Sequence, residues 1–202
     1  MGKLSSRFLT GGQAMLRLNF FLLILLILVL VISGFNFYPD FWLSGWDNLH
    51  PEFDFALNLK RALFSGWQEY QGLGLPAGHA HATELVRGGF LWLMAQVLPA
   101  TTLRKVFVFL MLFLGSAGVY FLSRYLLGFK NKSQNQRDFA DRRQLLSFLG
   151  AVFYLLNPVT LQIFYAPYEA FVVHYAALPW LLWIFLRFLS EPTPKNLSLI
   201  HI

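Results

Sequence analysis

The sequence contains no cysteine, so the chain has no disulfide, no thiolate metal site and no cysteine nucleophile. Charged residues are scarce as well, at 13% of the chain, whereas 56% of the residues are hydrophobic and 18% are aromatic. A typical soluble domain is roughly 45–50% apolar and about 25% charged. This composition argues against an ordinary soluble domain and predicts an integral membrane protein.

Motifs that carry the chemistry of many soluble enzymes are also missing. The sequence has no nucleophile elbow, no Walker motif and no HExxH zinc motif. The glycines of the turn-rich stretch 71–78 match neither a phosphate-binding loop nor a dinucleotide fingerprint. The net charge of +6 is concentrated in short segments beside apolar runs, which is typical of membrane orientation, so we expect no nucleic-acid partner.

Long apolar runs predict an all-α fold, a polytopic transmembrane helical bundle of about four spans. The predicted spans are 18–39, 105–129 and the two arms of a helical hairpin at 145–190. A run of this kind is long enough to cross about 30 Å of hydrocarbon at about 1.5 Å per residue. We expect the first arm of the hairpin to be interrupted at Asn157-Pro158, because proline breaks a helix.

The first apolar run also has the basic start of a signal peptide. It is longer than the usual apolar core of about 7–15 residues in such peptides. Phe35, Phe37 and Tyr38 also make a poor cleavage site, since cleavage requires small residues. We therefore favour an uncleaved anchor.

Positive charges predict the orientation of the helices. The segment 1–17 is basic and carries no acid, so it is expected in the cytoplasm, as is the basic loop 130–144. The two placements agree, because the chain crosses once outwards and once back between them. We predict a multi-pass plasma (cytoplasmic) membrane protein with a cytoplasmic N-terminus. The segment 40–104 is then an outer loop, and 191–202 is a cytoplasmic tail that looks truncated.

The outer loop carries an acidic stretch, GWDNLHPEFD, at residues 45–54. Asn48 or His50 followed by Pro51 predicts a helix start, because proline fits the first turn of a helix. The helix that follows is amphipathic, ends near Gly66 and is expected to lie on the bilayer surface.

Two further apolar stretches have features of their own. Residues 88–100 are too few to cross alone and predict a re-entrant or interfacial helix ended by Pro99. In the second predicted span, small residues cluster at 115–118, where they would allow another helix to approach closely.

Asp47 is the leading catalytic candidate, because it lies beside a predicted helix start in a loop anchored at both ends. Its carboxylate could act as a general base towards an acceptor hydroxyl, or help hold a divalent cation against a phosphate leaving group. The alternative is that Asp47 only caps the helix. In the same stretch, His50, Glu52 and Asp54 are candidate substrate-binding residues.

Four more ionisable residues complete the candidate site. Lys60 and Arg61 could bind a lipid phosphate, or they could neutralise the helix C-terminus and reach the headgroups. Glu169 and His174 belong to the outer end of the predicted hairpin, where ionisable groups are costly unless they face a cavity. Both are therefore candidate members of the site, His174 as a binding residue, with exposure to external water as the alternative.

Several short strings occur in order along the chain: GWD at 45–47, GLGLP at 72–76, LSR at 122–124 and FYLLNP at 153–158. Together with the predicted helices, they resemble the start of integral-membrane glycosyltransferases of the C-type superfamily. They are most similar to bacterial YfhO-like and arabinofuranosyltransferase-like membrane proteins, over most of residues 18–190. The resemblance implies a catalytic carboxylate in the first outer loop, Asp47, and a second acidic group, Glu169, from the next. It also implies a polyprenyl-phosphate sugar as the donor.

The expected function is therefore that of a membrane glycosyltransferase, of which the chain is the N-terminal part. It would transfer a sugar from a polyprenyl-phosphate donor to a glycan or lipid acceptor at the outer face. The sequence does not identify a cofactor, and a divalent cation bound at Asp47 is one candidate. The alternatives are a lipid-linked glycan transporter or flippase and a non-catalytic structural subunit. A transporter would carry ionisable residues at mid-depth in its spans, and none of the four predicted spans does.

Overall fold

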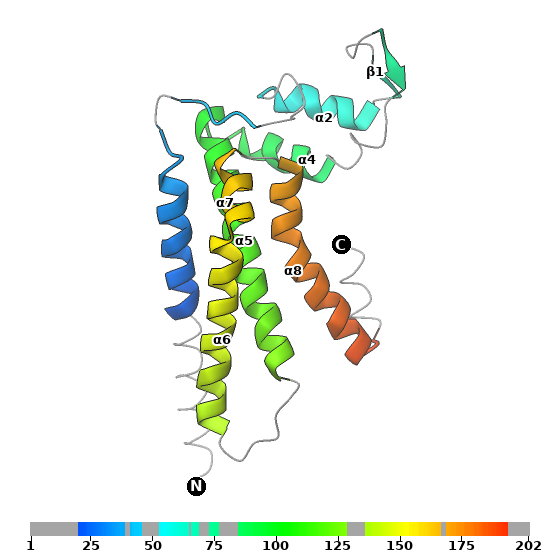
Figure 1. The fold of residues 1–202 in the computed structure, drawn as a ribbon. Helices are drawn as coiled ribbons and strands as arrows, with labels where there is room; N and C mark the ends of the chain where they lie inside the picture. The colour runs from blue at the N-terminus through cyan, green and yellow to red at the C-terminus, as the bar shows by residue number, and fades with distance from the viewer. Residues whose placement is uncertain are drawn as a thin grey trace. The chain divides into compact units, whose positions relative to one another are not determined.

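The computed structural model describes residues 20–38, 41–45, 53–64, 66–68, 73–76, 85–128, 136–166 and 169–193 of the chain. The chain forms two compact units. The helical unit comprises Met1–Phe37 and Val108–Ile202, and the intervening unit is Tyr38–Phe107. Helices provide nearly all of the regular structure in the described residues, as the fold class predicted (Figure 1).

Two helices of the described chain are long and apolar enough to cross a membrane. They are α5, Ala100–Gly128, and the part Phe171–Ser190 of helix α8. A third candidate arises if α6, Gln136–Leu156, and α7, Pro158–Tyr165, are taken together. The helix Phe20–Gly34, within the first predicted span, is shorter. These apolar helices support a membrane protein, but the prediction of four spans is not confirmed.

The predicted interruption at Asn157-Pro158 is confirmed. The chain bends by 50° between α6 and α7 at this point. The Asn157 side chain caps α7 by accepting a hydrogen bond of 2.9 Å from the Val159 amide, and proline occupies the first turn. Across the break, the Thr160 hydroxyl donates to the Tyr154 carbonyl at 3.0 Å, which satisfies an acceptor that the break leaves open.

The start of α6 differs from the sequence prediction. The basic segment 130–144 was expected to be a loop, but the chain is helical from Gln136 onwards. Neither proline nor glycine occurs between Gln136 and Leu149, so helix propensity extends the apolar helix into the basic segment. The loop predicted at 130–144 is therefore helical from Gln136 onwards, because the charge pattern marks a change of environment and not a helix end.

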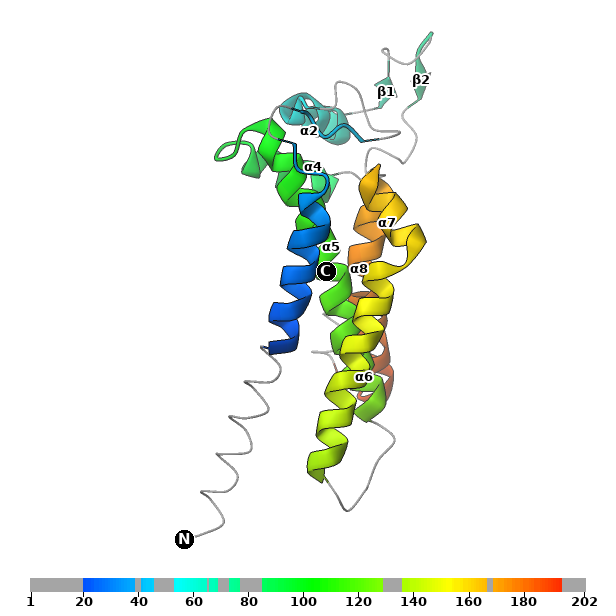
Figure 2. The ribbon, with the colours of Figure 1, turned by 60° about the vertical axis from the view of Figure 1, so that its left-hand side comes forward.

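In the helical unit, α5 is contacted by the helix Phe20–Gly34, by α6 and by α8 (Figures 1 and 2). A fully buried cluster joins the helix Phe20–Gly34, α5 and α6. It consists of Leu25, Tyr120 and Ala151. α6 runs antiparallel to α5, since Gly150 faces Ser123 while Arg143, earlier in α6, lies against Gly128 at the end of α5. α5 is therefore the centre of this unit.

α8, Glu169–Ser190, packs on the small residues of α5, as the cluster at 115–118 predicted. A β-carbon added at Gly115 would overlap the ring of Tyr175, and one at Gly118 would reach Pro179 and Trp180. The indole of Trp180 donates a hydrogen bond of 3.0 Å to the carbonyl of Leu114. The absence of side chains at the two glycines is what permits this close approach.

In the intervening unit, α2 extends over Phe55–Phe64 and packs against α4, Leu85–Met94. The predicted helix start near Pro51 is wrong, because Asp54 is the N-cap: its carboxylate accepts a hydrogen bond of 2.9 Å from the Leu57 amide. The helix stops before Gly66, as expected, and the Gly66 amide bonds to the Phe64 carbonyl at 2.9 Å.

α4 is too short to cross a membrane alone, as predicted, but Pro99 does not end it. The Pro99 carbonyl instead accepts hydrogen bonds from the amides of Thr102 and Leu103 and so begins α5. α5 therefore starts before the predicted boundary at residue 105 and includes two buried cations. The Lys105 ammonium donates to the Tyr38 carbonyl at 2.5 Å, and the Arg104 guanidinium lies 5.4 Å from the ring centroid of Phe53.

A short antiparallel ladder pairs β1, Trp67–Gln68, with β2, Leu75–Pro76. Gly74 leads into β2 with a φ of 97° and lies against the ring of Trp67. Both its conformation and its contact require glycine, because a β-carbon there would be strained and would overlap the indole.

Candidate functional site

Three of the predicted site residues, Asp47, His50 and Glu52, lie outside the described residues. The catalytic and metal-binding roles proposed for Asp47 therefore stay predictions. Among the residues that the structure does describe, no group of three histidine, aspartate or glutamate side chains could hold a metal ion.

Asp54, Lys60 and Arg61 all belong to α2 or to its cap, and the structure separates them along the helix. The exposed carboxylate of Asp54 caps the N-terminus. Lys60 is exposed and Arg61 half-buried near the other end, and six residues of helix span about 9 Å. Asp54 thus has a structural task of its own, whereas Lys60 projects its charge away from the packed side of α2.

Glu169 and His174 both lie on α8 in the helical unit. Glu169 is the first residue of the helix, and His174 is exposed within the next turn and a half. Five residues correspond to a rotation of about 140° around a helix axis, since each residue adds about 100°. The two positions therefore do not share one face of α8.

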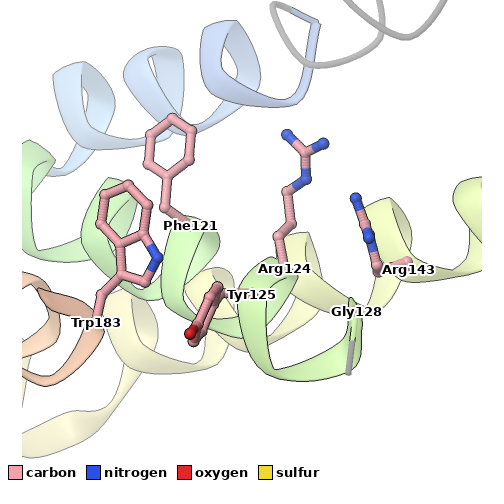
Figure 3. A pocket seen from close by; sticks show the side chains of 6 residues that line it. All are labelled: Phe121, Arg124, Tyr125, Gly128, Arg143 and Trp183. Atoms are coloured by element: carbon pink, nitrogen blue, oxygen red, sulfur yellow. The ribbon is translucent and has the colours of Figure 1, made fainter. Parts of the chain in front are cut away.

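The structure contains a pocket that the sequence analysis missed. It lies in the helical unit near the end of α5 and has a volume of about 390 Å³. Its lining comes from three helices: Phe121, Arg124, Tyr125 and Gly128 of α5, Arg143 of α6, and Trp183 of α8 (Figure 3). The sequence offers one signal for it, a charged residue, Arg124, inside the predicted span 105–129.

Each arginine has a close contact at its guanidinium group. The Arg124 guanidinium lies 5.7 Å from the ring centroid of Tyr120, and the Arg143 guanidinium lies against the backbone of Gly128. The two charges are near enough to repel one another. In Figure 3 both guanidinium groups extend from their helices in the same direction. The pocket thus concentrates positive charge at the end of two helices.

The aromatic side of the pocket is equally well fixed. Phe121 and Trp183 stack with their ring centroids 6.1 Å apart and an interplanar angle of 18°. The Tyr125 hydroxyl forms a hydrogen bond of 2.7 Å with the Ser190 hydroxyl, which ties α5 to α8. No lining residue is a carboxylate, serine, threonine or histidine, and the hydroxyl of the lining residue Tyr125 is bonded to Ser190, so the lining offers mainly binding groups.

No known protein family, curated protein or solved structure matches this chain.

Proposed function

We propose that the protein is a membrane glycosyltransferase that transfers a sugar from a polyprenyl-phosphate donor to a glycan or lipid acceptor at the outer face. The observation that supports this proposal most is the intervening unit, Tyr38–Phe107. A chain that only had to span the membrane would need no separate compact unit between its apolar helices. This unit contains the acidic stretch 45–54, where the catalytic candidate lies.

In the proposed reaction, Asp47 acts as the general base that takes the proton of the acceptor hydroxyl while the sugar leaves its phosphate. The hydroxyl oxygen bonds to the anomeric carbon, and the bond from that carbon to the phosphate oxygen breaks. The polyprenyl phosphate departs as an anion. A cation near that phosphate would stabilise the developing charge.

Lys60 is the residue of α2 best suited to that electrostatic role. It is exposed, and the helix that carries it is fixed by the Asp54 cap and by packing on α4. A fixed helix holds the backbone of Lys60 in place, so only the rotamers of its side chain are restricted on binding.

The test is a donor panel. Membranes carrying the native protein are supplied with radiolabelled polyprenyl-phosphate sugars and, in parallel, with the matching nucleotide sugars. The expected result is label in a glycan or lipid product from the polyprenyl-phosphate donors alone, and a several-fold higher KM for the donor in Lys60→Gln. Transfer from nucleotide sugars only, or movement of intact donor across the membrane without transfer, would contradict the proposal.

A further inference from the structure

The pocket lined by Arg124, Arg143 and Trp183 contains hydrogen-bond donors that the protein leaves unused. The Nε atoms of both arginines and the Nε1 atom of Trp183 are buried and have no hydrogen-bond partner among the described residues. An unsatisfied buried donor costs about 1–3 kcal/mol, and more when it is charged. A ligand that brings acceptor oxygens into this cavity would satisfy these three groups together.

The chemistry of the lining specifies the charge of that ligand. All three unused groups donate and none accepts, and a guanidinium stays protonated at any physiological pH. The six lining residues include no carboxylate that could neutralise the two arginines. An anion with several oxygen acceptors fits this arrangement, and phosphate is the group that the planar arginine fork binds best.

The position of the pocket distinguishes a lipid from a soluble ligand. Arg124 lies four residues before Gly128, the last residue of α5, which puts it about 6 Å inside the helix end. Arg143 comes just before the uncharged stretch of α6 that starts at Leu145. In helices that cross a membrane, cations at this depth reach the phosphate layer of the bilayer.

The helices that line the pocket also expose apolar surface. Large hydrophobic residues stay exposed on both α5 and α8. They are Leu126 of α5 and Leu182, Phe185 and Leu189 of α8. The stacked Phe121 and Trp183 form an aromatic side within the pocket itself. Acyl chains would cover such surface, whereas a soluble phosphate ester would leave it in water.

We propose that this pocket binds the phosphate-bearing headgroup of an anionic membrane lipid. The guanidinium groups of Arg124 and Arg143 hold the phosphate oxygens, and the indole of Trp183 donates a further hydrogen bond. The cavity of about 390 Å³ lies in the range of roughly 300–1,000 Å³ that is usual for small-molecule sites. This inference does not depend on the proposed transferase activity.

The test uses the full chain in phosphatidylcholine nanodiscs with an increasing fraction of phosphatidic acid, and it follows the midpoint of thermal unfolding. Native protein is expected to show a saturable rise, because a ligand that binds only the folded state stabilises it. Arg124→Gln and Arg143→Gln should require at least tenfold more phosphatidic acid for the same rise. Arg142→Gln is the matched control, since Arg142 is the exposed neighbour of Arg143 and does not line the pocket.

Two further variants keep the test valid if a glutamine variant fails to fold. Trp183→Phe retains an aromatic ring and loses only the donor, and Arg143→Lys retains the charge and loses the fork. Both should weaken the response several-fold while unfolding normally in pure phosphatidylcholine. An equal response in all variants, Arg142→Gln included, would overturn the proposal in favour of general surface attraction. An equal rise with inorganic phosphate in pure phosphatidylcholine would overturn it in favour of a soluble phosphate ligand.

Discussion

Asp54 is the predicted site residue whose role the structure describes best. Its carboxylate accepts the Leu57 amide hydrogen at 2.9 Å and its carbonyl accepts that of Asn58 at 3.0 Å, as an N-cap does. The sequence placed Asp54 among the substrate-binding candidates because it is acidic and lies near Asp47. A cap needs only a side-chain oxygen acceptor, whereas an electrostatic contact to a substrate needs the negative charge.

This difference separates the two roles experimentally. Asp54→Asn keeps the acceptor and should leave the amide hydrogen exchange of α2 nearly unchanged. Asp54→Ala removes it and should accelerate exchange there by about 2- to 30-fold, as expected for a loss of about 0.5–2 kcal/mol. Equal exchange in the native protein and in Asp54→Ala would show that the cap is unimportant. A loss of sugar transfer in Asp54→Asn, with exchange unchanged, would instead support a direct role of the carboxylate.

At the scale of helices, the contact of α5 with α8 depends on two glycines. Gly115 faces the ring and the carbonyl oxygen of Tyr175, and Gly118 faces Pro179 and Trp180. The Tyr175 ring also stacks on Tyr154 of α6 with centroids 4.3 Å apart, and the Tyr154 hydroxyl donates to the Tyr175 carbonyl at 3.1 Å. Tyr175 therefore has little room to move away from a larger residue on α5.

Gly115→Ala should consequently destabilise the helical unit by about 1–3 kcal/mol, the usual cost of overpacking a filled core. The matched control is Gly34→Ala in the helix Phe20–Gly34, where an added β-carbon meets nothing within 4 Å. Unfolding of both variants in the same detergent, followed by intrinsic tryptophan fluorescence, measures the difference. Equal stability of the two variants would contradict the close contact between α5 and α8.

Sequence alone predicted those features of the elements that depend on local chemistry. Asn157-Pro158 marks a break because proline lacks an amide hydrogen and asparagine caps well, and the glycines of α5 mark a close contact. The helix ends were less predictable. In the sequence, Lys105 is a charge at the start of a predicted span. In the structure it lies buried in α5, because the Tyr38 carbonyl provides an acceptor from a distant part of the chain.

At the scale of the whole molecule, the pocket could not be predicted from the sequence. Arg124 and Arg143 lie on different helices, and Trp183 comes from a third. The three side chains line one cavity because α5 packs against α6 and α8. The glycines in the sequence show that helices can approach closely there, but not which helices do so. In the sequence each arginine is only a charge at the edge of an apolar run, and such charges usually face water or headgroups.

The two units give the protein two separate tasks in this account. The intervening unit carries the acidic stretch and the proposed chemistry, and the helical unit carries the apolar helices and the proposed lipid pocket. Substitutions in the pocket should therefore change the response to anionic lipid, while substitutions in the acidic stretch should change transfer.

The most direct test of the central claim is sugar transfer from a radiolabelled polyprenyl-phosphate donor by native protein, Asp47→Asn and Asp54→Asn at equal expression. Removal of a general base commonly costs about 10²- to 10⁴-fold in rate. The account predicts a loss of this size in Asp47→Asn, whereas Asp54→Asn, which retains the cap, should transfer at close to the native rate. Native transfer that persists in Asp47→Asn would contradict a transferase centred on this carboxylate.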